Sequence, residues 1–324
     1  MSQAYGTLGY FGLIRQNSYG AYLTNPESAW DPSATMRFYP ILSEAVAMEI
    51  GQLEYGQMRG LMAEPNKLRG QEFSQGDVVF EGTPDLLTLV ARGVFGQESA
   101  SAAGSFWQHE FLPRQVDYEP RIALPPYSVE IYRGTGAAHR YLDSFFTSLR
   151  LELAGDGLLQ CTARMIARTT SEAARITPTF QVQTPWAWSG ASLTLAGSGI
   201  PDFQNIMISL DQLIEPVPRV DGQTRPGSFL RSAAQQVRVS GTINVDSYGA
   251  QQFANYFNRT NLTLQLFIAS LATSRDSLTI QVPQMRFTRF PLIISGPTRV
   301  TVAFDAEGVY DTDSRYAMRK LTGT

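Results

Sequence analysis

Few residues of this chain have the types and spacing that acid–base, nucleophilic or metal chemistry requires. The two histidines, His109 in FWQHEF and His139 in GTGAAHRY, lie outside any H-E-x-x-H spacing, and a single cysteine cannot supply a zinc cluster. Neither a G-x-x-x-x-G-K-[ST] phosphate loop nor a G-x-S-x-G nucleophile elbow occurs. We therefore expect no metal site and no cofactor.

Carboxylate pairs are the remaining candidates for catalysis, because two acids at a suitable separation can hydrolyse glycosides. Asp311 and Asp313 are close in sequence, but their segment, YDTDSRY, is tail-like. Asp77 and Glu81 would share one face of a strand, where the rise of an extended chain separates them by roughly 13 Å. This separation exceeds the catalytic range, so we expect that the protein is not an enzyme.

The composition is that of an ordinary folded chain. Its 324 residues are 43% hydrophobic and carry a net charge of −3, which disfavours a protein that grips nucleic acid tightly. No apolar run of about 18 residues and no basic region followed by an apolar run is present, so we expect neither a membrane span nor a secretion signal. Cys161 lies in an apolar strand-like segment, which favours a buried reduced thiol.

The elements that must position the polar side chains are mostly strands. Many short alternating segments are divided by Gly and Pro clusters, a pattern typical of sandwiches and barrels. Residues 43–55, 75–81, 127–133, 148–155, 158–167 and several segments after residue 191 have this character. The sequence therefore predicts a mainly β fold.

Two helices are expected in the body of the chain. The first runs from Pro84 to Phe95, with Thr83 in the capping position and Pro84 as its first residue. The second runs from about Tyr248 to Asn258, and its aromatic residues at 253, 256 and 257 form a stripe at helical spacing. Such stripes usually pack on a core, so we expect both helices to be docked through their apolar faces.

The strand before each helix follows one pattern. When Gly76 is aligned with Gly241, Val78 meets Ile243, and apolar positions fall on one face of both strands. The opposite face holds acids and small polar residues: Asp77 and Glu81 in the first strand, and Thr242, Asn244 and Asp246 in the second. Chance similarity between β-rich segments is the alternative to a duplication.

A loop rich in Gly, Pro and Arg precedes each of these strands. The first, Gly56 to Gly70, contains Arg59, Lys67 and Arg69, and the second, Pro216 to Arg231, contains Arg219 and Arg225. The unit of strand, long loop, strand, helix and further strands predicts two tandem modules, residues 1–172 and 173–324, joined near Thr169 to Pro185. One module followed by a decoration domain is the alternative.

The stretch from SYGAYLTNPESAWDPSATMRFYP to GDVVFEGTPDLLTLVARGVFG resembles the tail tube proteins of long-tailed, siphovirus-like bacteriophages. Tyr22-Leu23-Thr24 and Pro26-Glu27-Ser28 correspond to the early elements of that family, and Phe95-Gly96 to the end of its helix. The threonine after Tyr-Leu departs from the family pattern. The resemblance covers residues 15–170 well and the remainder more loosely.

The resemblance implies β-sandwich or split-barrel modules, each flanked by one short helix, whose strands combine in an oligomeric lumen barrel. Six modules form a ring and rings stack into a tube, so a chain with two modules would form a homotrimer, and a chain with one a homohexamer. The tube would be a virion tail component, assembled in the host cytoplasm and holding tape measure protein and genomic DNA without sequence-specific binding.

The resemblance also assigns roles to the polar strand face and to the two loops. An acidic or neutral wall would repel phosphates mildly and let DNA pass, whereas a basic wall would retain it. The lumen-facing candidates are Glu49, Glu72, Asp77, Glu81, Thr242, Asn244 and Asp246. The inter-ring contact candidates are Arg59, Lys67, Arg69, Arg219 and Arg225. A solvated sheet face and a mobile loop are the respective alternatives, and Arg238 conflicts with the first role unless an acid pairs with it.

Two other functions remain open from the sequence. A tail terminator or an injection-apparatus tube would share the fold but form a single ring. A carbohydrate-binding β-sandwich would need an exposed aromatic platform, for which Trp186 and Trp188 are the obvious pair.

Overall fold

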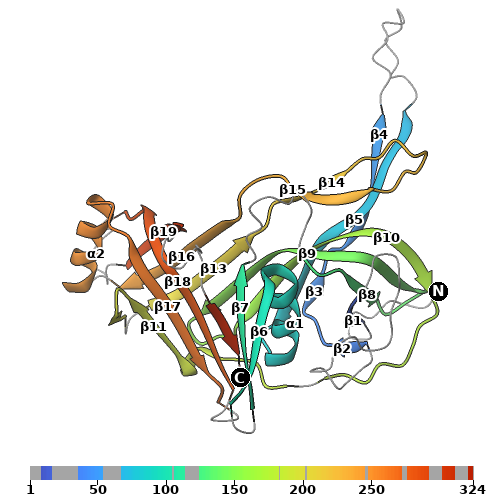
Figure 1. The fold of residues 1–324 in the computed structure, drawn as a ribbon. Coiled ribbons are helices and arrows are strands. Elements are labelled where there is room, and N and C mark those ends of the chain that lie inside the picture. Colours follow the sequence, from blue (N-terminus) through green and yellow to red (C-terminus); the bar gives the residue numbers. More distant parts are fainter. Residues whose placement is uncertain are drawn as a thin grey trace, which may run out of the picture.

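The computed structural model describes residues 9–16, 36–53, 67–103, 106–113, 124–181, 183–200, 203–244, 247–271, 276–291, 301–310 and 320–323. Strands dominate these residues, as the sequence predicts, and two α-helices accompany them, α1 (Pro84–Phe95) and α2 (Ser247–Phe257). A short 3-10 turn, η2, covers Trp188–Gly190. Figure 1 shows α1 near the middle of the molecule and α2 at its far edge.

Seven strands form a continuous antiparallel path that we call the central sheet. Their order in space is β4 (Ala47–Leu53), β5 (Leu68–Glu81), β10 (Gln160–Ala173), β9 (Ala138–Ala154), β13 (Phe203–Asp211), β16 (Gln236–Asn244) and β19 (Thr301–Gly308). The pairing of β9 with β13 joins the two halves of the chain within this sheet.

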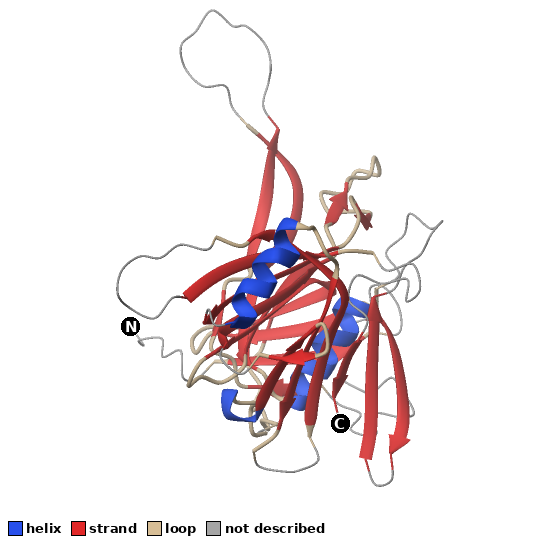
Figure 2. Ribbon diagram, turned by 90° about the vertical axis from the view of Figure 1, so that its left-hand side faces the viewer, coloured by secondary structure: helices blue, strands red, loops and turns tan. Residues whose placement is uncertain are grey.

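The other strands extend this sheet or form hairpins beside it. In the first half these are β1 (Tyr10–Arg15), β2 (Arg37–Tyr39), β3 (Ser43–Glu44), β6 (Gly96–Ala103), β7 (Phe106–Pro113) and β8 (Tyr127–Tyr132). In the second half they are β11 (Ala191–Leu195), β12 (Ser198–Gly199), β14 (Ile214–Val217), β15 (Ser228–Arg231), β17 (Leu262–Ala269), β18 (Ser277–Arg289) and β20 (Lys320–Gly323). The hairpin of β4 and β5 extends beyond the other described strands in both views (Figure 1, Figure 2).

The strand pairings of the first half recur in the second half. The first half pairs β1–β2, β1–β8, β4–β5, β5–β10, β8–β9 and β9–β10. The second half pairs β11–β12, β11–β17, β13–β16, β16–β19, β17–β18 and β18–β19. Each helix follows the corresponding strand, α1 after β5 and α2 after β16. The hairpins β6–β7 and β14–β15 each occur in one half.

Both strands of the Gly76–Gly241 alignment carry the same burial pattern. Ser74 and Val78 in β5 are buried with three half-buried residues between them, and so are Val239 and Ile243 in β16. Each glycine faces a backbone carbonyl of a neighbouring segment, the bend before β4 for Gly76 and strand β13 for Gly241. A Cβ on Gly76 would overlap the oxygen of Ala45, and one on Gly241 would lie 2.7 Å from the oxygen of Asn205.

One hydrophobic core runs through both halves of the chain. It includes Val78 and Phe80 from β5, Leu151 from β9, Ile208 from β13 and Phe304 from β19, all at most 4% exposed. The halves therefore fold against each other rather than around separate cores. Burying side chains of this size contributes about 1.5–3 kcal/mol each, which ties the halves together.

Helix α1 has the bounds that the sequence predicts, and eight of its residues are buried. Pro84 opens the helix, and Gly96 ends it with a φ of 77°, a left-handed conformation that favours glycine. Thr83 occupies the N-cap position, as the sequence predicts, but its hydroxyl makes no capping hydrogen bond. Instead, the backbone N–H of Asp85 donates to Oε1 of Gln183 at 2.8 Å.

Helix α2 is docked less deeply than its aromatic stripe predicts. Tyr256 packs against the core, but Phe253 is 39% exposed and Phe257 is 79% exposed. The expectation of a buried stripe is therefore wrong for these two phenylalanines. Helical spacing places side chains on one face, but it does not supply a second layer to cover that face.

Three other expected boundaries change. The segment 43–55 is two strands, because the chain bends at Ala45 and Val46 between β3 and β4. Residues 68–70 of the first expected loop belong to β5, and residues 54–66 lie outside the described part. The second expected loop, Pro216 to Arg231, contains strands β14 and β15, which pair from Val217–Ser228 to Ile214–Arg231.

The segment between the halves is attached to the first half along its length. The N–H of Ile176 donates to the hydroxyl of Tyr10 at 3.3 Å, and the N–H of Gln181 to the carbonyl of Phe38 at 2.9 Å. The N–H of Trp186 donates to the carbonyl of Gly82 at 3.0 Å. These contacts fix the path of the chain from β10 to β11.

Candidate functional site

The central sheet has one apolar and one polar side. Val78 and Phe80 are each 1% exposed on the first side, which we call the core face, whereas Asp77 is half-buried and Glu81 exposed on the second, the polar face. In β16, Ile243 lies on the core side, and Thr242 and Asn244 point the other way and are half-buried. The alternation predicted from sequence is confirmed for both strands, while Asp246 lies outside the described residues.

The strand registers extend the polar face across all seven strands. Paired residues of an antiparallel sheet point to the same side. Asp77 on β5 is paired with Arg164 on β10, Arg164 with Ser148 on β9, and Ser148 with Asp211 on β13, so all four side chains lie on the polar face. Among described residues its acids are Glu49, Asp77, Glu81, Glu152, Glu172, Asp211, Asp305 and Glu307, and its basic residues are Arg150, Arg164, Arg168 and Arg238. Acids therefore outnumber bases on this face.

Each of these four arginines has an acidic neighbour, and that of Arg168 is Asp143 at 3.5 Å. Arg164 is the register partner of Asp77, and Arg150 donates to Glu152 at 2.8 Å. From the sequence, the positive charge of Arg238 conflicted with the prediction of an acidic or neutral face. In the structure Arg238 is the register partner of Glu307 on β19, and it also donates to Gln236 at 2.7 Å. Positive charge on this face is thus offset locally by carboxylates.

Two further lumen candidates fall on different sides of the sheet. Glu49 accepts a hydrogen bond from Gln75 at 2.5 Å, which places it on the side of Asp77. Glu72 lies an even number of residues from Val78 on the continuous strand β5, so its side chain belongs to the core side. Glu72 and Asp77 therefore cannot line one wall, and the grouping of Glu72 with the other candidates is corrected.

Glu72 instead takes part in contacts at the base of the β4–β5 hairpin. Its N–H donates to the carbonyl of Thr224, and its carboxylate accepts from Arg69 at 2.6 Å. The hydrogen bond from Thr224 and the adjacent charge of Arg69 lower the pKa of Glu72, against an opposing effect of burial. These contacts join β5 to the loop between β14 and β15.

The inter-ring candidates therefore lie in two neighbouring regions. Lys67 and Arg69 lie where β5 begins, and Arg69 is ion-paired with Glu72. Arg219 and Arg225 are exposed in the connection between β14 and β15, which reaches β5 through Thr224. Arg59 lies outside the described residues.

The anchoring of the β14–β15 hairpin was not predicted from the sequence. Phe229 is 2% exposed and packs edge-on against Phe145 of β9, with ring centroids 5.6 Å apart. The carbonyl of Pro226 accepts from Arg168 of β10 at 2.9 Å. A hairpin of the second half thus lies over strands of the first half. Only the isolated aromatic residue in a loop rich in Pro and Gly could have signalled it.

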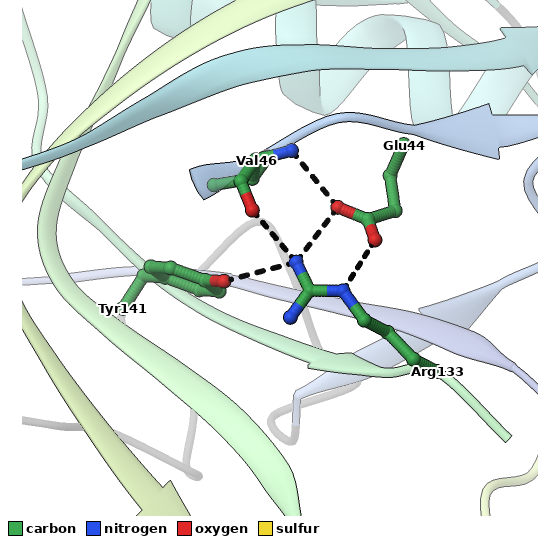
Figure 3. A network of polar contacts seen from close by, with 4 residues as sticks. All are labelled: Glu44, Val46, Arg133 and Tyr141. Carbon is green, nitrogen blue, oxygen red and sulfur yellow. Dashed lines mark hydrogen bonds and ion pairs between the residues drawn. The ribbon is translucent and has the colours of Figure 1, made fainter. Parts of the chain in front are cut away.

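An arginine-centred network fixes the bend between β3 and β4 (Figure 3). Arg133 donates to both carboxylate oxygens of Glu44, at 2.5 and 3.0 Å, and to the carbonyl of Val46 at 2.7 Å. The N–H of Val46 donates to Glu44 at 2.9 Å, and Tyr141 accepts from Arg133 at 3.3 Å. The hydrogen bond to Glu44 raises the pKa of Arg133. This network holds the start of β4 in place.

Several of the residues considered above for catalysis or sugar binding are buried or are in contact with neighbouring side chains. His109 contacts Glu98 at 2.8 Å, and burial raises the pKa of the Cys161 thiol. Trp186 is 1% exposed and Trp188 packs against the core, so these two tryptophans do not form an exposed platform. No group of three or more metal-binding side chains is found among the described residues. In the same residues, the two helices are too short or too polar to span a membrane.

Comparison with known proteins identifies the family. A family model described as phage tail tube protein matches residues 6–308, which includes both halves of the recurring strand pattern. No curated protein matches the chain. Because the family match covers nearly the whole sequence, the chain belongs to the phage tail tube proteins, which are structural components of the virion tail.

Proposed function

We propose that this chain is the repeating subunit of a tail tube whose rings stack into a conduit for phage DNA. The observation that carries the proposal is the polar face of the central sheet, which spans seven strands and holds more acids than bases. The opposite face is covered by the core and α1. The β14–β15 hairpin covers the polar face around Phe145, so the rest of the polar face is the side available to line a channel.

The charges of this face suit passage of DNA rather than its retention. Duplex DNA carries a dense row of phosphates, and every cation that neutralises a phosphate adds salt-dependent affinity. Here the four arginines lie beside acids, so few positive charges are presented to a phosphate. Surplus carboxylates such as Asp211 and Glu81 repel the genome mildly, which leaves a layer of water between DNA and wall.

We further propose that the chain holds two modules, 1–172 and 173–324, and that three chains complete a ring. The recurrence of six strand pairings in the same order supports two copies of one unit over a tube module with a decoration domain. Two units per chain favour a trimer with pseudo-sixfold symmetry over a hexamer. Assembly in the host cytoplasm around a tape measure protein belongs to the same proposal.

Electron microscopy of the purified protein, alone and with its tape measure protein, tests this function. We expect hollow tubes of regularly spaced rings, each with three chains. Isolated single rings would instead favour a tail terminator or an injection-apparatus component. A chain that stays monomeric under all these conditions would contradict the tube proposal.

A further inference from the structure

Strand β4 has an open edge. It pairs with β5 along one side, and within the described residues no strand pairs with its other side. All seven of its residues are exposed. An open edge offers unpaired backbone N–H and C=O groups to any strand that can approach it.

The recurring pairings identify β13 as the counterpart of β4. Each strand pairs with the strand that precedes a helix, β4 with β5 and β13 with β16. Met48 is opposite Ser74, and Ile208 is opposite Val239, the residue that aligns with Ser74. Met48 therefore corresponds to Ile208, and two residues later Ile50 corresponds to Leu210.

These matched residues differ sharply in exposure. Ile208 and Leu210 are each 1% exposed, whereas Met48 is 49% exposed and Ile50 is 48% exposed. The exposure differs because β13 has a neighbour along its second edge and β4, among the described strands, does not. Strand β9 pairs with that edge of β13 and places Leu151 opposite Ile208 and Leu149 opposite Leu210. Strand β4 carries the same apolar side chains without such a neighbour.

The strand that corresponds to β9 is β18. β9 pairs with β8 and β10, and β18 pairs with β17 and β19, which hold the same places in the second half. Within one chain β18 cannot repeat the β9–β13 pairing, because β13 is already paired with β9. The β18 strand of a second copy of the chain could instead pair with β4, the counterpart of β13.

We propose that the open edge of β4 receives β18 of a second copy of this chain, antiparallel, repeating between chains the pairing that β9 and β13 make within one. The inference rests on the proposed ring and names the surface that closes it. Met48 and Ile50 would then be covered as Ile208 and Leu210 are. Leu53 and Leu68, 59% and 50% exposed, are paired with each other further along the hairpin and lie on its other side.

The β14–β15 hairpin of the second half corresponds in position to the β4–β5 hairpin of the first half. The β14–β15 hairpin follows β13, crosses the β9–β13 seam and packs Phe229 on Phe145. The described part of the β4–β5 hairpin holds the same position in the first half, so we expect it to lie against the second half of the neighbouring copy.

Hydrogen–deuterium exchange of the wild-type chain, compared before and after assembly, tests the seam without any substitution. The amides of β4 should exchange roughly tenfold or more slowly in the assembled state. Those of β13 should be protected in both states, because β9 and β16 already cover both its edges. Assembled rings in which β4 exchanges as fast as in the monomer would overturn the seam and leave the tube function intact.

A double variant tests the same surface by a second route. Met48→Lys with Ile50→Lys should keep the monomer's circular dichroism and unfolding temperature, since both side chains are exposed, but reduce ring formation at least tenfold. Phe267→Lys is the matched control, because Phe267 is 37% exposed on β17, a strand paired on both sides. Normal rings from the double variant would overturn the seam alone. Failure of the wild type to form any ring would overturn the proposed function as well.

Discussion

Arg238 on β16 lies directly opposite Glu307 on β19, so a basic residue on the polar face is matched by an acid across one strand pair. Arg164 on β10 and Asp77 on β5 repeat this relationship at another pair of strands. Opposite charges in register stabilise a strand pair by about 0.2–1 kcal/mol. Their larger effect is on the field of the face, because the pairing cancels positive charge where phosphates would pass.

Reversal of charge on this face is expected to slow genome release. Virions that carry Asp77→Lys with Glu81→Lys should assemble tubes but eject DNA roughly tenfold more slowly, with partial recovery as salt rises from about 50 to 200 mM. Time-resolved ejection into a DNA-binding dye measures the rate. Asp221→Lys, in the exposed β14–β15 connection, is the control and should leave ejection unchanged. Unchanged ejection in the double variant would remove both residues from the channel wall.

Substituting either member of the Arg238–Glu307 pair is expected to affect DNA ejection differently. Glu307→Gln leaves Arg238 without its carboxylate partner, so ejection should slow and become more sensitive to salt. Arg238→Gln removes the cation and should leave ejection as fast as in the wild type. The same ejection assay at two salt concentrations distinguishes them. If both variants behave alike, the pair does not face DNA.

The two aligned glycines are expected to be intolerant of a side chain. Gly76→Ala and Gly241→Ala should each lower the free energy of unfolding by about 1–3 kcal/mol, because the new Cβ meets a backbone carbonyl that cannot move freely. Urea unfolding followed by circular dichroism measures the loss. Gly199→Ala is the control, since a Cβ added there would meet no atom within 4 Å, and it should change stability little. Equal stability of all three variants would contradict a close approach of the strands.

Alkaline pH is expected to weaken the attachment of the linker through Tyr10. Burial and the hydrogen bond to Glu130 raise the pKa of Tyr10 from 10.0 to about 12, so the folded state favours the neutral phenol. The resulting stability is complete below the unfolded pKa near 10 and is lost as the pH rises toward 12. Tyr10→Phe should flatten the fall of the unfolding free energy between pH 10 and 12, which denaturant titrations at each pH measure. An unchanged slope would exclude Tyr10 as the titrating group.

Local rules predicted the elements that depend on near neighbours. The bounds of α1 follow from Pro84 and Gly96, and the two faces of β5 and β16 follow from strict alternation around Val78 and Ile243. The acidic character of the polar face was visible in Asp77 and Glu81. The partner of Arg238 was not, because Glu307 is 69 residues away and only the strand register brings the two together.

The remaining failures come from long-range packing. Trp186 is buried because the linker folds back onto Gly82, and Phe257 is exposed because no described strand covers that side of α2. Glu72 is an exception to this, because its position on the opposite side of β5 from Asp77 follows from local strand alternation alone. The bend at Val46 depends on Arg133, which is 87 residues away, so no local pattern could reveal it.

In the proposed three-chain ring, the β9–β13 pairing would place half of the joints between modules within single chains, before any chains meet. Each intermolecular association costs about 4–15 kcal/mol in lost translational and rotational freedom, and a ring of three chains would incur this cost twice, against five times for a ring of six. Nucleation of the first ring should accordingly depend on a lower power of the subunit concentration. Tube growth can then begin in an infected cell while little of the protein has been made.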